Sequence, residues 1–203
     1  AIELIPALLD AGIDSLKSEG RMKRPEYVAT IVRTYRKAID HHLHRDSAPV
    51  DAEDLDHLAQ VFNRDFTTAY MEKRQGKYMM SDRRPNNRGL LIGRVSAYDR
   101  SSHCVTVKLS RKLAIGDQVD FWVKVGGRVS AEIEHLYNAQ GKECVEAAAG
   151  DAVSFVICGK VHVNDRVFKV YDVKLMDAAR HSYDPAHSEK IPLRAVLHAR
   201  LGE

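Results

Sequence analysis

Residues 104–109 read Cys-Val-Thr-Val-Lys-Leu, an alternation of apolar and polar side chains that is typical of a half-buried β-strand. The same period of two, or an unbroken run of β-branched residues, recurs from Leu90 to Leu175. Further strands are predicted at Val119–Val125, Val129–Ile133, Val153–Ile157 and Val167–Val173. Six or seven short strands at this spacing predict a small closed antiparallel β-barrel over residues 90–179.

Glycine-containing turns separate these predicted strands. The pair Gly126-Gly127 lies between two apolar runs and predicts a two-residue hairpin loop. Gly116-Asp117 and Gly150-Asp151 each come before an apolar strand, so we expect them at corners of the barrel.

The first 45 residues have a helical pattern instead. Apolar side chains recur near a period of 3.6 in residues 1–12 and in residues 25–43, where Pro25 suits a first helical turn. Between these two helices, Ile13–Glu19 is predicted as a short strand. Because one strand cannot form a sheet, we expect residues 1–45 to begin inside a larger α/β domain.

Residues 46–89 are expected to connect the two parts. Asp51 and Asp54 have the spacing of a helix capping box, and the apolar residues after them predict a short helix. Basic side chains dominate residues 72–89, which end in turn-forming residues and are predicted as an interdomain linker.

The last 24 residues are predicted as a separate segment. Residues 180–203 are expected to be a polar connection followed, from Ile191 to Leu201, by the first strand of a truncated further domain.

Composition excludes several classes of protein. The chain has 203 residues, 31 Lys and Arg against 28 Asp and Glu, and 44% apolar residues, which excludes a disordered, collagenous or disulfide-stapled protein. No apolar run is long enough to span a membrane, and no signal peptide is visible. The three cysteines form no metal-ligand spacing. We therefore expect a cytoplasmic protein without a membrane partner.

Common catalytic signatures are absent from the sequence. It contains no HExxH, GxSxG, paired CxxC or GxGxxG motif. His41 and His44 lie three residues apart at the end of a predicted helix, where cationic side chains are favoured without a metal. We therefore expect no metal site in this chain.

The richest candidate site lies around the start of the second helix. Lys17 and Glu19 share one face of the predicted strand, near the end where a barrel carries its chemistry, so they are candidate catalytic residues. Arg21, Lys23 and Arg24 precede a helix N-terminus and are candidate anion- or substrate-binding residues. A structural Lys17–Glu19 pair beside a solvated basic loop is the open alternative.

The basic linker is a second candidate. Arg83, Arg84 and Arg88 lie in a stretch that also carries Tyr78, so they could contact the phosphates of a nucleic acid. A solvated linker without a ligand is the alternative.

Several motifs resemble peptidase family U32, the collagenase-like proteins. The most specific block is Glu19-Gly20-Arg21-Met22-Lys23, followed by Pro25-Glu26-Tyr27-Val28-Ala29 and Tyr35-Arg36-Lys37-Ala38. The resemblance continues through Phe62-Asn63-Arg64, Pro85-Asn86-Asn87-Arg88-Gly89, Gly116-Asp117, Val161-His162-Val163-Asn164-Asp165 and Lys169-Val170.

This resemblance implies a larger parent protein. Residues 1–45 would be the last strand and helix of the family's (β/α) barrel, and residues 90–179 a downstream β-barrel similar to domain 2 of translation elongation factors. In members that hydroxylate RNA bases or a quinone precursor, upstream cysteines hold an iron–sulfur cluster. Cys104, Cys144 and Cys158 do not match those positions, so no cofactor is expected in this chain itself. Ser18 also departs from the family pattern, which has an apolar residue there.

Three functions follow from the resemblance. The chain would be the C-terminal part of a U32 peptidase, inactive alone, whose β-barrel positions a polypeptide or other macromolecular substrate. Alternatively, the parent is an iron–sulfur-dependent RNA hydroxylase, with the basic linker and the barrel contacting RNA. In a third alternative the barrel only covers the catalytic domain. The expected partners are the chain's own upstream barrel domain and a second copy pairing through the N-terminal segment.

Overall fold

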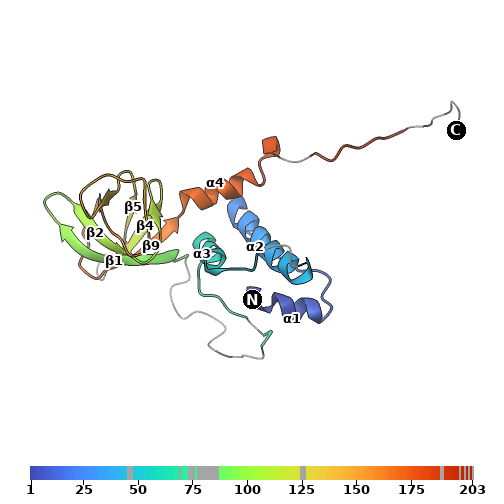
Figure 1. Ribbon diagram of the computed structural model, residues 1–203, viewed down its shortest axis with the longest axis horizontal. Coiled ribbons are helices and arrows are strands. Elements are labelled where there is room, and N and C mark those ends of the chain that lie inside the picture. Colours follow the sequence, from blue (N-terminus) through green and yellow to red (C-terminus); the bar gives the residue numbers. More distant parts are fainter. Residues whose placement is uncertain are drawn as a thin grey trace.

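A curled antiparallel sheet of seven strands, a half-barrel, dominates the computed structural model (Figure 1). The structure describes residues 1–44, 48–68, 70–72, 76, 87–123, 127–187, 190–196, 198, 200 and 202. The nine strands are β1 (Leu90–Asp99), β2 (Cys104–Leu109), β3 (Leu113–Ala114), β4 (Gln118–Trp122), β5 (Arg128–Glu132), β6 (Tyr137–Asn138), β7 (Glu146–Ala147), β8 (Ala152–Val156) and β9 (Arg166–Tyr171). The large sheet has the order β5-β4-β9-β1-β2-β8-β6, and β3 pairs with β7.

The predicted antiparallel β fold is confirmed, with strands close to the expected positions. Val105, Val107 and Leu109 of β2 point into the core, while Thr106 and Lys108 point away from it. The sheet has β5 and β6 as its edges, and no pairing between the described residues of these two strands closes it into a full barrel. Of the predicted Gly126-Gly127 hairpin loop, Gly126 lies outside the described residues, but β4 and β5 pair antiparallel as expected.

The helices form a second, smaller core beside the sheet. They are η1 (Ile2–Leu4), α1 (Ile5–Asp10), α2 (Pro25–His44), α3 (Ala52–Val61), α4 (Val173–His181) and η3 (Pro185–His187). Ile2, Ile5 and Leu58 are buried together against the apolar faces of α2 and α3. None of the described helices is both long and apolar enough to cross a membrane.

The capping box predicted for α3 is present. The Asp54 amide donates to Asp51 Oδ1 at 2.9 Å, and the Asp51 amide donates to Asp54 Oδ2 at 3.1 Å. These reciprocal bonds satisfy backbone donors that a helix start otherwise leaves unpaired, so the local sequence alone sets where α3 begins.

Two stretches that were predicted as strands are not strands in the described part of the chain, and one helix was not predicted. Residues 13–20 form no strand, because no neighbouring strand in the described chain offers them hydrogen-bond partners. The described residues between Ile191 and Leu201 also form no strand. Helix α4 was not predicted, since its apolar start continues the run of β9. Asp172, whose Oδ1 accepts the Leu175 amide at 2.9 Å, is the N-cap signal that marks it.

Helices α3 and α4 join the helical part to the sheet. Helix α4 follows β9 directly and packs on α2, as Figure 1 shows. Helix α3 lies against β9, where buried Gln60 donates from Nε2 to the carbonyl of Lys169 at 3.0 Å. A pair of Arg111 with Asp56 ties the end of β2 to the same helix. The start of α2 therefore lies close to one end of the sheet.

Candidate functional site

The turn before α2 brings basic side chains to this junction. The Lys23 amide donates to the Gly20 carbonyl at 2.9 Å, and Met22 between them has a φ of 62°. The Arg21 amide donates to Glu19 Oε1 at 3.0 Å. Pro25 then starts the helix. This tight turn fixes the direction in which Lys23 leaves the backbone.

Lys23 lies over an aromatic ring supplied by the chain just after α3. Its Nζ is 3.1 Å from the centroid of the Phe62 ring, and Arg64 Cζ lies 4.9 Å from the same centroid. Tyr27 meets Phe62 edge-on at 6.3 Å. Neither cation makes a salt bridge to a carboxylate among the described residues. Partial burial, and secondly the charge of Arg64, hold the pKa of Lys23 below its usual range.

Lys23, Tyr27 and Phe62 line a cavity of about 330 Å³ between the helices and the sheet. We call it the basic–aromatic cleft. Its wall also includes Arg24 at the start of α2 and Tyr171 at the end of β9. Gln60 lines it as well, and its Oε1 atom is buried without a hydrogen-bond partner among the described residues. The cleft thus combines positive charge, aromatic surface and an unused acceptor, a combination that suits an anionic ligand with hydrogen-bond donors.

Hydrogen bonds between two segments of the chain hold Phe62 in place beside the cleft. The Asn63 amide donates to Asn87 Oδ1 at 2.8 Å, and Asn63 Nδ2 donates to the Gly89 carbonyl at 3.1 Å. Arg88 is buried and its guanidinium pairs with Asp65. The structure therefore brings two segments with U32-like motifs, residues 62–65 and 87–89, into direct contact.

Glu26 anchors the other side of the cleft. It is buried and accepts from Arg180 Nε of α4 at 2.9 Å, while Arg180 also donates to the Tyr171 hydroxyl at 3.2 Å. Burial raises the pKa of Glu26, but its own backbone amide and Arg180 together outweigh this, so the pKa lies below its usual range. Glu26 is thus ionised and neutralised, and leaves the charge of the cleft positive.

The structure places some of the predicted site residues in the cleft and others outside it. Lys23 and Arg24 line the cleft, whereas Lys17, Glu19 and Arg21 are exposed outside it.

Because residues 13–20 form no strand, the strand parity that put Lys17 and Glu19 at a barrel mouth does not operate in this structure. Arg83 and Arg84 lie outside the described residues, and the contact with Asp65 accounts for Arg88 without a ligand.

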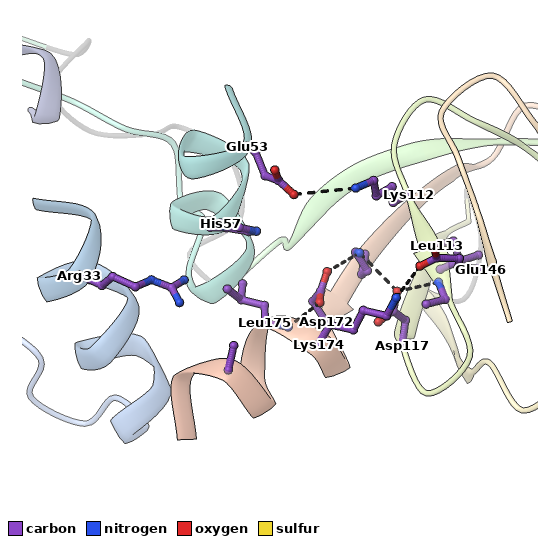
Figure 2. Close-up of a pocket in the computed structure, with 13 residues that line it drawn as sticks. Arg33, Glu53, His57, Lys112, Leu113, Asp117, Glu146, Asp172, Lys174 and Leu175 are labelled. Carbon is purple, nitrogen blue, oxygen red and sulfur yellow. Dashed lines mark hydrogen bonds and ion pairs between the residues drawn. The ribbon is translucent and has the colours of Figure 1, made fainter. Parts of the chain in front are cut away.

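A second cavity, of about 240 Å³, lies between α3, α4 and the sheet (Figure 2). Lys169 is buried at its base between two carboxylates, with Nζ 3.3 Å from Asp117 Oδ2 and in a short contact with Asp172. Arg33 and His57 project toward the opening from α2 and α3.

The two carboxylates at this cavity differ in their ionisation. Burial raises the pKa of Asp117 despite the opposing charge of Lys169. Burial acts in the same direction on Asp172, but the charge and hydrogen bond of Lys169 outweigh it, so its pKa is lowered. Both also accept backbone amides: Asp117 from Ala114 and Val173, and Asp172 from Leu175. With their acceptors used in this way, the group Asp117–Lys169–Asp172 holds α4 to the sheet and is not a free acid–base pair.

Sequence reasoning missed the structural centres of both cavities. Phe62 and Lys169 were noticed only as parts of U32-like motifs, and nothing local shows that Phe62 meets Lys23 from 39 positions away. The one signal that could be read was Asp172, an acidic residue before an apolar helical run, which indicates the N-cap of a helix.

The residues present do not fit a metal or an iron–sulfur cluster. The described residues contain no group of three or more His, Cys, Asp or Glu side chains that could hold a metal ion. Cys104, Cys144 and Cys158 are free and belong to no such group among the described residues.

Comparison with known proteins places the cleft in a family context. Residues 1–81 match the model of peptidase family U32. This range includes Lys23, Tyr27 and Phe62 of the basic–aromatic cleft, and Arg64 beside Phe62. The predicted resemblance to peptidase family U32 is confirmed.

U32 relatives carry two kinds of name. The chain is 34% identical over 145 residues to tRNA hydroxylation protein P1 of Bacillus subtilis (strain 168), covering 70% of this chain and 34% of that protein. It is 29% identical over 162 residues to tRNA hydroxylation protein P of Escherichia coli (strain K12), covering 74% and 33%. It is 28% identical over 176 residues to a collagenase of Porphyromonas gingivalis, covering 83% and 47%. The chain thus spans from a third to about half of these relatives.

Solved structures are also similar. One of them is the C-terminal domain of a Geobacillus thermoleovorans putative U32 peptidase, at 22% identity and a TM-score of 0.38, covering 39% of this chain and 91% of that domain.

Proposed function

We propose that this chain is the substrate-positioning part of a U32 protein and that the basic–aromatic cleft contacts the substrate. The observation that carries this proposal is the placement of Lys23 and Arg64 on one Phe62 ring without a neutralising carboxylate among the described residues. Two uncompensated cations beside one ring repel each other, and an anionic group of a substrate near them reduces that repulsion.

The substrate of the first form of this proposal is a polypeptide, and the parent is a collagenase-like peptidase. Among the described residues that line the cavities, Asp117, Asp172 and Glu26 are used by backbone amides or by structural ion pairs, and we assign the chain no nucleophile–base pair among them. Its contribution is then to hold an acidic or aromatic stretch of polypeptide near the catalytic domain.

The second form is RNA positioning within a tRNA-hydroxylating protein of the cytoplasm. The cation–aromatic character of the cleft favours it, because phosphates pair with Lys and Arg and bases stack on aromatic rings. The similarity to tRNA hydroxylation proteins supports the same substrate class. Any cluster-dependent chemistry would belong to other parts of the parent protein.

Exposed apolar side chains support a further domain as partner. Ile13, Leu16, Val28 and Val32 are between 38% and 50% exposed, and two of them lie one turn apart on α2. An apolar stripe of this kind suits packing against the parent's barrel domain or a second copy of the chain.

The test is binding of fluorescent RNA and of gelatin peptides to the purified chain. Lys23→Met and Phe62→Leu should each weaken binding of the true substrate several-fold, because they remove the charge and its aromatic support. Lys142→Met, an exposed lysine remote from the cleft, is the matched control. Equal binding by all three variants and the unaltered chain would contradict the proposed site.

A further inference from the structure

A row of basic side chains crosses the outer face of the sheet, away from the cleft. Strand register places Arg128 opposite Trp122, Trp122 opposite Arg166, Arg166 opposite Arg94, and Arg94 opposite Lys108. Directly opposed residues of antiparallel strands lie on the same face. The adjacent row, which includes Phe121, Val167 and Leu109, lies in the core, so the basic row faces outward.

Three neighbouring cations of this row are not neutralised. Arg94, Lys108 and Arg166 lie on three adjacent strands, are exposed, and make no salt bridge among the described residues. Arg94 Nη1 donates to the Asn164 carbonyl at 3.0 Å and Lys108 donates to the Gly150 carbonyl, contacts that leave both charges uncompensated. Strands β2, β8 and β9 contain no acidic residue.

Such a row lowers the stability of the sheet. Like charges placed directly opposite each other on neighbouring strands are destabilising, and here two such pairs are contiguous. Among the acidic residues of this face, Asp120 pairs with Arg128 at 2.9 Å and accepts from the Ser130 hydroxyl at 2.6 Å, while Glu132 of β5 lies opposite Gln118. An arrangement that lowers stability points to a ligand whose binding neutralises these charges.

Aromatic rings hold Arg166 in position. The guanidinium carbon of Arg166 lies 5.1 Å from the Trp122 ring centroid and 5.9 Å from that of Phe168, and the two rings are tilted by 31° with their centroids 4.6 Å apart. This cation–π support orients the guanidinium before any ligand arrives. Arginine held in this way matches the two oxygens of a phosphate.

A shallow hollow lies alongside the row. It has a volume of about 580 Å³ and is lined by Arg94 and Lys108 together with the exposed apolar side chains of Leu91 and Val163. Cations and apolar surface in one hollow suit a nucleotide, with its phosphate on the row and its base in the hollow.

We propose that the row formed by Arg94, Lys108 and Arg166 binds the phosphodiester backbone of an RNA strand. The proposal rests on the RNA form of the proposed function and adds a second contact surface to it. Because neighbouring strands lie about 4.8 Å apart, the three cations form a line and not a converging cradle. A line suits a chain of phosphates better than a single small anion.

The test compares two triple variants by anisotropy of a fluorescent single-stranded RNA at several salt concentrations. The row variant carries Arg94→Gln, Lys108→Gln and Arg166→Gln. The control carries Arg100→Gln, Lys142→Gln and Lys160→Gln, three exposed basic residues outside the row. Both remove three positive charges from a chain of formal net charge +3.

The row variant should bind RNA roughly tenfold or more weakly, and the slope of log K against log salt should become shallower by about 2. The control should stay near the unaltered chain. The row variant should also unfold at the same temperature or higher, because neutralisation removes like-charge repulsion. Lys108→Gln alone, at an exposed position, should show a smaller loss of the same kind if the triple variant does not fold.

Other outcomes separate the two proposals. If only the cleft variants Lys23→Met and Phe62→Leu weaken RNA binding, the row is overturned and the proposed function stands. Binding of gelatin but not of RNA overturns the row and leaves the polypeptide form. Equal losses of RNA affinity in the row variant and the control variant would show nonspecific charge attraction and overturn the row. The same holds if the row variant loses affinity for polyglutamate and for anionic vesicles as much as for RNA. Binding of neither RNA nor gelatin overturns both proposals.

Discussion

Lys169 shows how a single buried residue connects the two parts of this chain. It lies on β9, and its ammonium group forms ion pairs with Asp117 in the β3–β4 turn and with Asp172 at the start of α4. Its own backbone carbonyl also accepts from Gln60 of α3. Lys169 on β9 therefore contacts α3, α4 and the β3–β4 turn, and the sequence showed only its membership in a U32-like motif.

Replacement of Lys169 by Met should be strongly destabilising. Removing one partner of a buried ion group leaves uncompensated charge, here two carboxylates, at a cost of about 3–5 kcal/mol. The measurement is the free energy of unfolding in urea. The control is Lys174→Met, which breaks only the exposed pair with Glu146 and should have little effect. Similar losses in both variants would refute the central role of Lys169.

Asp99 gives a residue-scale prediction about pH. The Ser102 hydroxyl, then the amide and hydroxyl of Ser101, lower the pKa of Asp99 from 3.8 to about 2. Because the folded carboxyl releases its proton more readily than the unfolded one, it stabilises the fold above pH 3.8. This stabilisation is lost as the pH falls through about 2.

Carbon-13 NMR titration of the Asp99 carboxyl measures this pKa directly. Ser102→Ala should raise it toward the ordinary value, whereas Ser110→Ala, remote from the turn, should leave it unchanged. A titration of Asp99 near its ordinary value in the unaltered protein would contradict the hydrogen bonding described.

At the scale of elements, the linker joins the sheet where the backbone of Gly89 lies close to the backbone of β9. Gly89 has a φ of +67°, and a Cβ there would lie 2.2 Å from the carbonyl oxygen of Lys169. Gly141 has a similar φ of +72° but open space around it. The two glycines separate the cost of backbone strain from the cost of a clash.

Gly89→Ala should therefore destabilise the protein much more than Gly141→Ala. Gly141→Ala introduces only the left-handed backbone strain of about 1–2 kcal/mol. Gly89→Ala must also displace β9. Thermal unfolding of both variants checks this. Equal shifts of the midpoint would show that the linker and β9 do not touch at Gly89.

Elements that depend on local signals could be predicted, and those that depend on distant partners could not. The cap of α3 and the alternation of β2 were readable, because both follow from residues a few positions apart. Residues 13–20 carry a strand pattern but lack a neighbouring strand in the described chain.

The same distinction applies to the candidate sites. Lys23 could be predicted from its position before a helix, but its ring partner Phe62 could not. The basic row depends on strand register, which places Arg94 opposite both Lys108 and Arg166. These residues are scattered in the sequence and gave no signal there.

At the scale of the whole molecule, the chain presents positive charge on two separate surfaces. The basic–aromatic cleft lies where helices meet the sheet, and the row of Arg94, Lys108 and Arg166 lies on the outer face of the sheet. Both surfaces lack neutralising carboxylates among the described residues, although the formal net charge of the whole chain is only +3. Charge is therefore concentrated, and this arrangement favours one extended anionic partner over many weak contacts.

The central claim is that this chain holds a macromolecular substrate, and one titration tests it most directly. Fluorescent tRNA and fluorescent gelatin are each titrated with the purified chain at several salt concentrations. We expect saturable binding of the RNA that weakens steeply as salt rises, because several phosphates are contacted at once. Saturable binding of neither polymer at any salt concentration would contradict the account and leave a purely structural cover as the role of this chain.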